Sequence, residues 1–259
     1  MTLPPPQSLT APETRLAPQS VKATFGVRSR SGVVHPMVDE LVAEQLGQTD
    51  AQGQLVSAVD RTRFIVIERP GIPRRAFKIT HAVASGTGHA PAQLEVHGTD
   101  MLRMLSDIPA MSAPTTWTGE WTTFTRDWAG PEDQGILFDQ PRDLAGIKLV
   151  TVADGATIEG PAEATIRRLI SESLAAAFRV AGVDDHPVQV VPIPTGKTSP
   201  HIMIRPTDKP LWEEIAALCL AAGVRVSATM WWPTDPQPPG LALTLPTVVV
   251  RVEQVQEVI

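Results

Sequence analysis

The stretch GPAEATIRRLISESLAAAFRVAG, residues 160–182, carries the clearest structural pattern in the chain. Pro161 stands where the first turn of a helix tolerates a residue without an N–H group, and Gly182 is typical of the position just after a helix. Between them apolar residues recur at helical spacing, namely Ile166, Leu169, Ile170, Leu174, Ala177 and Phe178. We predict an amphipathic helix with one face against a core.

The residues after this helix indicate strands and a second helix. Apolar, β-branched runs are bounded by glycine and proline, as strands are, and another helical pattern ends at Gly223. The expected elements are strands at Val188–Ile193 and His201–Ile204 joined by a Pro194–Pro200 hairpin turn, a helix at Pro210–Ala222, and a strand pair at Val224–Trp232 and Leu241–Val252. This half of the chain therefore mixes both kinds of structure.

The residues before the helix are richer in strand patterns. The expected elements are strands at Val21–Val27, Phe64–Glu68, Phe77–Ala84, Gln93–Val96 and Thr115–Thr125, and short helices at Met37–Leu46 and Thr99–Leu105. Thr99 is the expected cap of the second short helix. The chain contains 25 prolines, which favour turns and edge strands over long helices. We predict an α+β, β-rich fold.

Three segments are expected along the chain. Residues 1–20 hold five prolines and are interpreted as an extended N-terminal arm, disordered alone and ordered on a partner. Residues 21–150 are expected to form a β-rich subdomain, and residues 151–259 an α+β subdomain with two amphipathic helices.

Composition limits the function. The formal net charge of -6 and the pI near 5.5 argue against tight nucleic-acid binding, which needs clustered Lys and Arg, but suit a surface past which DNA only moves. The single cysteine, Cys219, lies in an apolar run and is expected to be a buried hydrophobe. No apolar run reaches the roughly 18 residues of a membrane span, and the N-terminus lacks a signal core. We expect no stable membrane insertion, and synthesis in the cytoplasm.

Catalytic motifs are weak or incomplete. The segment PTGKT at residues 194–198 ends like a phosphate-binding loop, but that motif needs a glycine where Val191 stands. The best local candidate for metal binding or proton transfer is the run Asp184, Asp185 and His186. A solvated loop after a helix explains the same residues. We therefore expect no catalytic residue, no cofactor and no metal.

Tryptophan is the aromatic residue that marks candidate interfaces here, because the chain has six tryptophans and no tyrosine. The candidate interface residues are Trp117, Trp121, Trp128, Trp231 and Trp232. Trp231 and Trp232 are adjacent in a predicted strand and should point to opposite faces, so that one is core and the other faces a partner. Burial of both within the chain is the alternative.

Two stretches share their pattern with a known family. The first is Val96-His97-Gly98-Thr99-Asp100-Met101-Leu102, which is similar to a V-x-G-x-D-x-L turn into a short helix. The second runs from Glu163 through the paired strands to Pro210-Leu211-Trp212-Glu213-Glu214-Ile215-Ala216 and Gly223, and continues into the Trp231–Val250 ending. Both stretches resemble the hub proteins at the tail tip of long-tailed bacteriophages, above all minor tail proteins of phages of actinobacteria. The resemblance covers roughly residues 60 to 259 and contains no active site.

The resemblance implies barrel-like subdomains, a homotrimer, and a place at the virion tail tip. The implied neighbours are the distal tail protein, the tape-measure protein and tip or fibre proteins, with DNA only in transit. At 259 residues the chain is short for a complete hub, so other chains are expected to supply the tip. The alternatives are a carbohydrate- or receptor-binding module of a phage tail, which would stack exposed tryptophans on sugars, and an enzyme that uses Asp184, Asp185 and His186.

Overall fold

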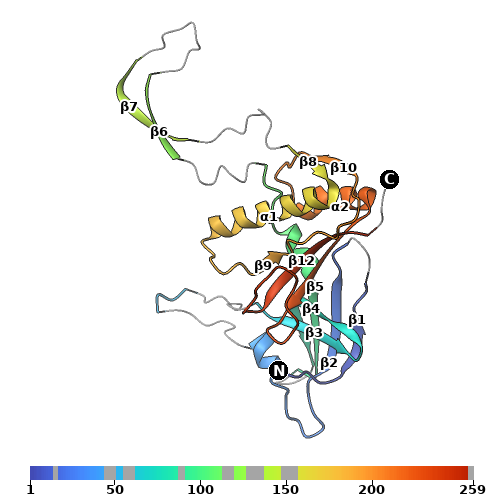
Figure 1. The fold of residues 1–259 in the computed structure, drawn as a ribbon. Helices are drawn as coiled ribbons and strands as arrows, with labels where there is room; N and C mark the ends of the chain where they lie inside the picture. The colour runs from blue at the N-terminus through green and yellow to red at the C-terminus, as the bar shows by residue number, and fades with distance from the viewer. Residues whose placement is uncertain are drawn as a thin grey trace.

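The computed structural model describes residues 1–13, 17–43, 51–54, 62–86, 91–112, 120–126, 137–146 and 157–255. Within these ranges the chain is α+β and β-rich. A five-stranded sheet curls into a half-barrel, and two α-helices pack on a second, three-stranded sheet (Figure 1). The predicted fold class is confirmed.

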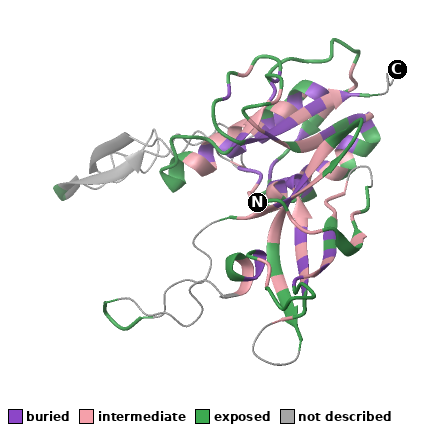
Figure 2. Cartoon of the chain, turned by 90° about the horizontal axis from the view of Figure 1, so that it is seen from below, coloured by how far each residue is buried: buried purple, intermediate pink, exposed green. Residues whose placement is uncertain are grey.

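The half-barrel is built from strands close together in sequence. They are β1 (Pro6–Thr10), β2 (Ser20–Gly26), β3 (Phe64–Arg69), β4 (Ile72–Ser85) and β5 (Gln93–Asp100), in the spatial order β1-β2-β5-β4-β3 with every pair antiparallel. Buried and exposed residues alternate along β2, as a sheet with one solvated face requires (Figure 2). Phe77 and Leu94 are fully buried on the core face, beside Met37 next to the π-helical turn η1 (Asp39–Ala43).

The N-terminal arm is part of this sheet. β1 pairs with β2, and the guanidinium of Arg75 donates to the carbonyl oxygens of Ala11 (2.8 Å) and Pro12 (2.7 Å). The hypothesis of an arm that is disordered alone is therefore wrong for Pro6–Thr10. The prolines that suggested an arm are compatible with an edge strand, which needs backbone N–H groups on one side only.

The second unit is built mainly from the C-terminal half. Its elements are β8 (Ile158–Pro161), α1 (Ala162–Ala181), β9 (Val188–Val190), β10 (His201–Ile204), α2 (Leu211–Ala222), β11 (Val224–Trp231) and β12 (Thr247–Gln254). Both predicted helices and the predicted β11–β12 pair are confirmed, with Gly182 and Gly223 in left-handed conformations directly after the helices. Val188, Val226 and Val250 of the sheet share one core with Ile166 and Ile170 of α1.

The predicted hairpin between Val188 and Ile204 does not form. β9 pairs in parallel with β12, and β10 pairs antiparallel with β8. The two strands lie in different sheets because the residues between them, Val191–Pro200, do not form a tight turn. They cross the N-terminal end of α1 and bind to it. Ala162 N–H donates to the carbonyl of Pro200 at 2.8 Å.

Strands β6 (Glu120–Arg126) and β7 (Leu137–Gly146) pair antiparallel as a two-stranded ribbon. The ribbon stands away from both sheets in Figure 1. Its first strand overlaps the predicted Thr115–Thr125 strand from Glu120 onward and extends one residue beyond it, while residues 115–119 lie outside the described residues. The boundary near residue 150 stays a prediction. The 3-10 turn η2 (Met101–Ser106), which precedes the ribbon, packs into the core of the C-terminal unit.

Candidate functional site

The turn from β5 into η2 is built around a glycine and an aspartate. A Cβ on Gly98 would lie 2.7 Å from the carbonyl oxygen of Lys78 and 3.1 Å from Cγ1 of Val21, so β2 and β4 approach β5 here as only glycine permits. The Asp100 carboxylate accepts hydrogen bonds from the N–H of Gln19 (2.9 Å) and the N–H of Arg103 (3.3 Å). Burial raises the pKa of the Asp100 carboxyl, although these hydrogen bonds act in the opposite direction.

The predicted cap of this turn was wrong by one residue. Asp100 caps η2, whereas Thr99 lies in β5, paired with Ser20 and Lys78. The extended conformation that a cap needs occurs at Asp100, because the strand continues to this residue, four residues beyond its predicted end at Val96.

η2 and α2 meet although more than a hundred residues separate their starting points, Met101 and Leu211. Leu102 and Leu105 share a core with Leu211 and Ile215. The Leu211 N–H also donates to the carbonyl of Ile108 at 2.8 Å. Apolar packing and a backbone hydrogen bond therefore hold η2 and the residues after it to the start of α2.

A polar side chain extends this connection. Asp208 accepts from the backbone N–H and the hydroxyl of Ser112, each at 2.8 Å. Asp208 has φ = 61°, a left-handed conformation that aspartate adopts more readily than most residues. The segment before α2 is thus held to the segment after η2.

Glu163 in the first turn of α1 is the centre of a buried polar network. Its carboxylate accepts from the Thr195 N–H (2.8 Å), the Thr195 hydroxyl (2.6 Å) and Nη2 of Arg167 (2.5 Å), and Arg167 also donates to the carbonyl of Val252 at 2.8 Å. Burial alone would raise the pKa of Glu163, but the hydrogen bonds from Thr195 and the charge of Arg167 outweigh it, so the pKa lies below its ordinary value. Thr195 belongs to the PTGKT segment, so this segment binds to the first turn of α1 within the same chain.

A second branch of the network fixes β12. The Ser199 hydroxyl accepts from the Glu163 N–H (3.0 Å) and donates to Oε1 of Gln254 (2.7 Å). Nε2 of Gln254 donates to the carbonyl of Ala222 at 2.7 Å, just where α2 ends. Sequence patterns did not reveal these partners, because they meet only after the chain has folded.

Of the six tryptophans, two are buried, one is partly exposed, and three have side chains outside the described part of the chain. Trp231 is only 5% exposed, packs with Val191, Leu243 and Val249, and donates from Nε1 to the carbonyl of Pro236 at 3.0 Å. It is the core member of the Trp231–Trp232 pair. Trp212, which was not a candidate interface residue, is also buried. Trp117 and Trp128, and the side chain of Trp121 in β6, lie outside the described part of the chain.

Trp232 lies at a contact between the two units. Its ring is partly exposed, whereas its Nε1 is buried and has no hydrogen-bond acceptor among the described residues. Its backbone N–H donates to Asp235 at 3.0 Å, and Asp235 forms an ion pair with Arg74 of β4. The turn after β11 is therefore attached to the half-barrel.

The run Asp184, Asp185 and His186 lies at a hollow of about 640 Å³, which is also lined by Ser171, Leu174 and Ala175 of α1 and by the Ala242–Thr247 segment. The His186 ring lies 5.1 Å from the ring of Phe178, centroid to centroid. Throughout the described ranges, no three His, Cys, Asp or Glu side chains are grouped so as to hold a metal ion.

Cys219 lies in the core of the C-terminal unit, on α2. It is fully buried, and burial raises the pKa of its thiol to about 12. The thiol is therefore protonated at neutral pH, as expected of a buried hydrophobe.

No protein-family model matches the chain, and neither does any curated protein. Among the described residues there is no helix with the length and apolar character needed to cross a membrane.

Proposed function

We propose that this chain is a structural component of a phage tail tip, of the baseplate hub or minor tail protein type. In this role it joins the distal tail tube to tip or fibre proteins and forms part of the channel for DNA ejection. The proposal includes no catalytic role and no cofactor. The expected partners are further copies in a homotrimer, the distal tail protein, the tape-measure protein and the tip proteins.

The contact between η2 and α2 is the observation that carries the proposal. The first resembling stretch ends in the first two residues of η2, and Leu102 and Leu105 of η2 share a core with Leu211 and Ile215 of the second stretch. Gly98 and Asp100, the G and D of the first stretch, have structural roles at the entry to that contact. Residues that make up one connected structural unit are a stronger basis for a resemblance than two separate matches.

Two further features are compatible with a place in an assembly. The β6–β7 ribbon stands clear of both sheets (Figure 1), and an isolated two-stranded ribbon is marginally stable in water, so a neighbouring chain would stabilise it. The net charge of -6 would not hold DNA that passes through a channel.

A sugar-binding module would need exposed tryptophan rings that lie in one plane. Trp212 and Trp231 are 7% and 5% exposed, so they do not provide such a platform. No other described feature favours that function, and the structural role remains our proposal.

Immunogold electron microscopy of virions of the source phage tests the proposal, with antibody raised to the whole chain. Gold confined to the tail tip is the expected result, and antibody pre-adsorbed with the purified chain serves as the control. If intact and detergent-disrupted particles both stay unlabelled, the structural function is overturned. Light scattering of the purified chain measures its oligomeric state in a separate test. A hub subunit that assembles only on its neighbours would be monomeric alone and would still lie at the tail tip.

A further inference from the structure

Strand β9 is the edge of the C-terminal sheet. The strand order is β11-β12-β9, so β12 covers only one side of β9. On that side the Val191 N–H donates to the carbonyl of Val250 at 2.9 Å. Because the backbone groups of successive residues point to opposite sides of a strand, those of Val188 and Val190 point away from β12.

The outward backbone groups of β9 are not bonded within the described part of the chain. The N–H and C=O groups of Val188 and Val190 have no partner there, although Val188 is only 2% exposed. The Ala242–Thr247 segment lies nearby but does not act as a fourth strand, because Leu243 bonds through its N–H (3.0 Å) and C=O (2.8 Å) to the side chain of Gln237. Backbone groups of a buried residue are nearly always paired in proteins, so β9 is an edge that lacks its next strand.

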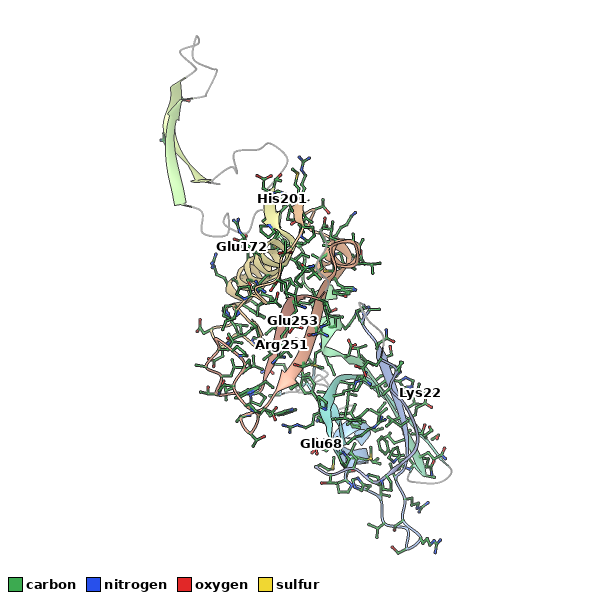
Figure 3. All side chains as sticks on the ribbon, turned by 45° about the vertical axis from the view of Figure 1, so that its right-hand side comes forward. Lys22, Glu68, Glu172, His201, Arg251 and Glu253 are labelled. Carbon is green, nitrogen blue, oxygen red and sulfur yellow. The ribbon has the colours of Figure 1, made fainter. Side chains whose placement is uncertain are left out.

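The hollow of about 640 Å³ lies along this edge, because its walls belong to opposite faces of the sheet. One wall is α1, which contributes Leu174 and shares a core with Val250. Figure 3 shows this helix, with Glu172 labelled, above the sheet. The other wall includes Leu243, which packs with Val249 on the opposite face. A space that touches both walls and β9 therefore lies beyond the edge strand.

The walls of the hollow are largely apolar, and one end is acidic. Leu174 and Ala175 line it on the side of α1, and Leu245, which is 57% exposed, lines it on the other side. Asp184 and Asp185 line it just before β9, and both are exposed. None of the described lining residues is a lysine or an arginine. The carboxylates are therefore complementary to a cation that enters the hollow.

We propose that β9 and the hollow beside it form a docking groove for an extended segment of a partner protein. The segment adds to the sheet as a fourth strand, bonds to the outward groups of Val188 and Val190, and places a lysine or arginine beside Asp184 and Asp185. Its alternate side chains contact α1 and the Ala242–Thr247 segment. The proposal rests on the geometry of β9 and does not depend on the role of the chain in a phage tail.

Hydrogen exchange of the full chain alone, followed by NMR, tests whether the edge is open. We expect the amides of Val188 and Val190 to exchange at least about tenfold faster than those of Gln189 and Val191, which face β12. Equal protection of all four amides in dilute protein would overturn the open edge. Protection of Val188 and Val190 that rises with protein concentration would identify a second copy as the occupant and overturn a partner protein.

The same amides report on docking of a synthetic probe, the peptide acetyl-Lys-Val-Thr-Val-Thr-Val-Lys-amide. A lysine at each end allows either strand direction. At saturation the peptide should slow exchange of Val188 and Val190 by about tenfold or more. The same peptide N-methylated at its central residues has no N–H groups to donate there and should give no protection. Binding that leaves the two amides unprotected, or no binding, would overturn the proposal.

A charge substitution tests the acidic end of the groove. Asp184→Asn combined with Asp185→Asn should weaken binding of the lysine peptide by about fivefold and should not weaken binding of a peptide with glutamate in place of both lysines. Glu213→Gln combined with Glu214→Gln on α2 makes the same change of charge away from the hollow and should leave both affinities unchanged. Equal affinity of the lysine peptide for the wild type and the Asp184/Asp185 variant would overturn a basic partner segment.

Discussion

At the scale of single residues, the strongest prediction about stability concerns Glu163. It is a buried carboxylate bound to Thr195 and Arg167. Glu163→Gln leaves the Arg167 charge without its partner, and we expect the free energy of unfolding to fall by about 3 kcal/mol. Chemical denaturation of the wild-type chain and the variant measures this difference in unfolding free energy. Glu172→Gln on the same helix, where an exposed pair with Arg168 is removed, is the control and should cost under about 0.5 kcal/mol.

The same carboxylate predicts a pH dependence. Because its pKa in the folded chain lies below the ordinary 4.5, its stabilising contribution is complete above that value and is lost as pH falls through the folded pKa. The difference in unfolding free energy between wild type and Glu163→Gln should therefore shrink between about pH 6 and about pH 3. A constant difference over that range would show that the carboxylate is not stabilised by folding.

Cys219 offers a reactivity prediction. Its thiol is buried and its pKa is raised to about 12, so a disulfide reagent should modify the native chain only when α2 opens. Modification should be slow in buffer and fast in denaturant, as followed by absorbance. Rapid, complete labelling of the native chain would show that this part of the core is open to solvent.

At the scale of secondary-structure elements, Gly98 controls how closely three strands approach. Gly98→Ala brings a methyl group to within 2.7 Å of the Lys78 carbonyl, and we expect the free energy of unfolding to fall by about 2 kcal/mol or more. Amides of β2 and β4 should exchange faster.

Gly71→Ala is the comparison for this substitution. Gly71 has a positive φ but nothing within 4 Å of an added Cβ, so the cost there is backbone strain alone, about 1 kcal/mol. Equal effects of the two substitutions would argue against a crowding role for Gly98.

Local patterns predicted the elements well and their partners poorly. α1 and α2 were predictable because proline, apolar spacing and a final glycine all lie within each helix. β1 was missed because the prolines in and around it indicate an arm, and only pairing with β2 turns it into a strand. The β9–β10 hairpin was wrong because short apolar strands carry no information about distant partners.

At the candidate site, too, local features could be predicted from the sequence and contacts between distant residues could not. Trp231 is the core member of the tryptophan pair, whereas Trp232 follows the end of β11 and is partly exposed; a partner on its exposed side stays a prediction. The Glu163 network and the stacked rings of His81 and His97 on β4 and β5 were not predicted. Their members come from separate elements, and a β-bulge, which no local pattern indicated, aligns His81 with His97.

At the scale of the whole molecule, the two units are expected to unfold together. Phe64 of β3 packs on the core of the C-terminal unit, and η2 of that core follows β5 directly. Because all six tryptophans lie at residue 117 or later, their fluorescence reports on the C-terminal half, while far-UV circular dichroism reports on both. We expect coincident transitions in urea, and two separate midpoints would show independent units.

Because β12 is the middle strand of its sheet and is synthesised late, the two units cannot fold at the same time during translation. Residues 6–100 contain every strand of the half-barrel, so these strands can begin to pair while a ribosome is still translating the rest. The sheet of the C-terminal unit cannot form so early, because its middle strand is β12, which is synthesised after every other described element. Val252 and Gln254 of β12 also bind Arg167 and Ala222. Until β12 emerges, the apolar faces of α1 and α2 stay open to chaperones, and a nascent chain stalled before residue 247 has every strand of the half-barrel but no β12.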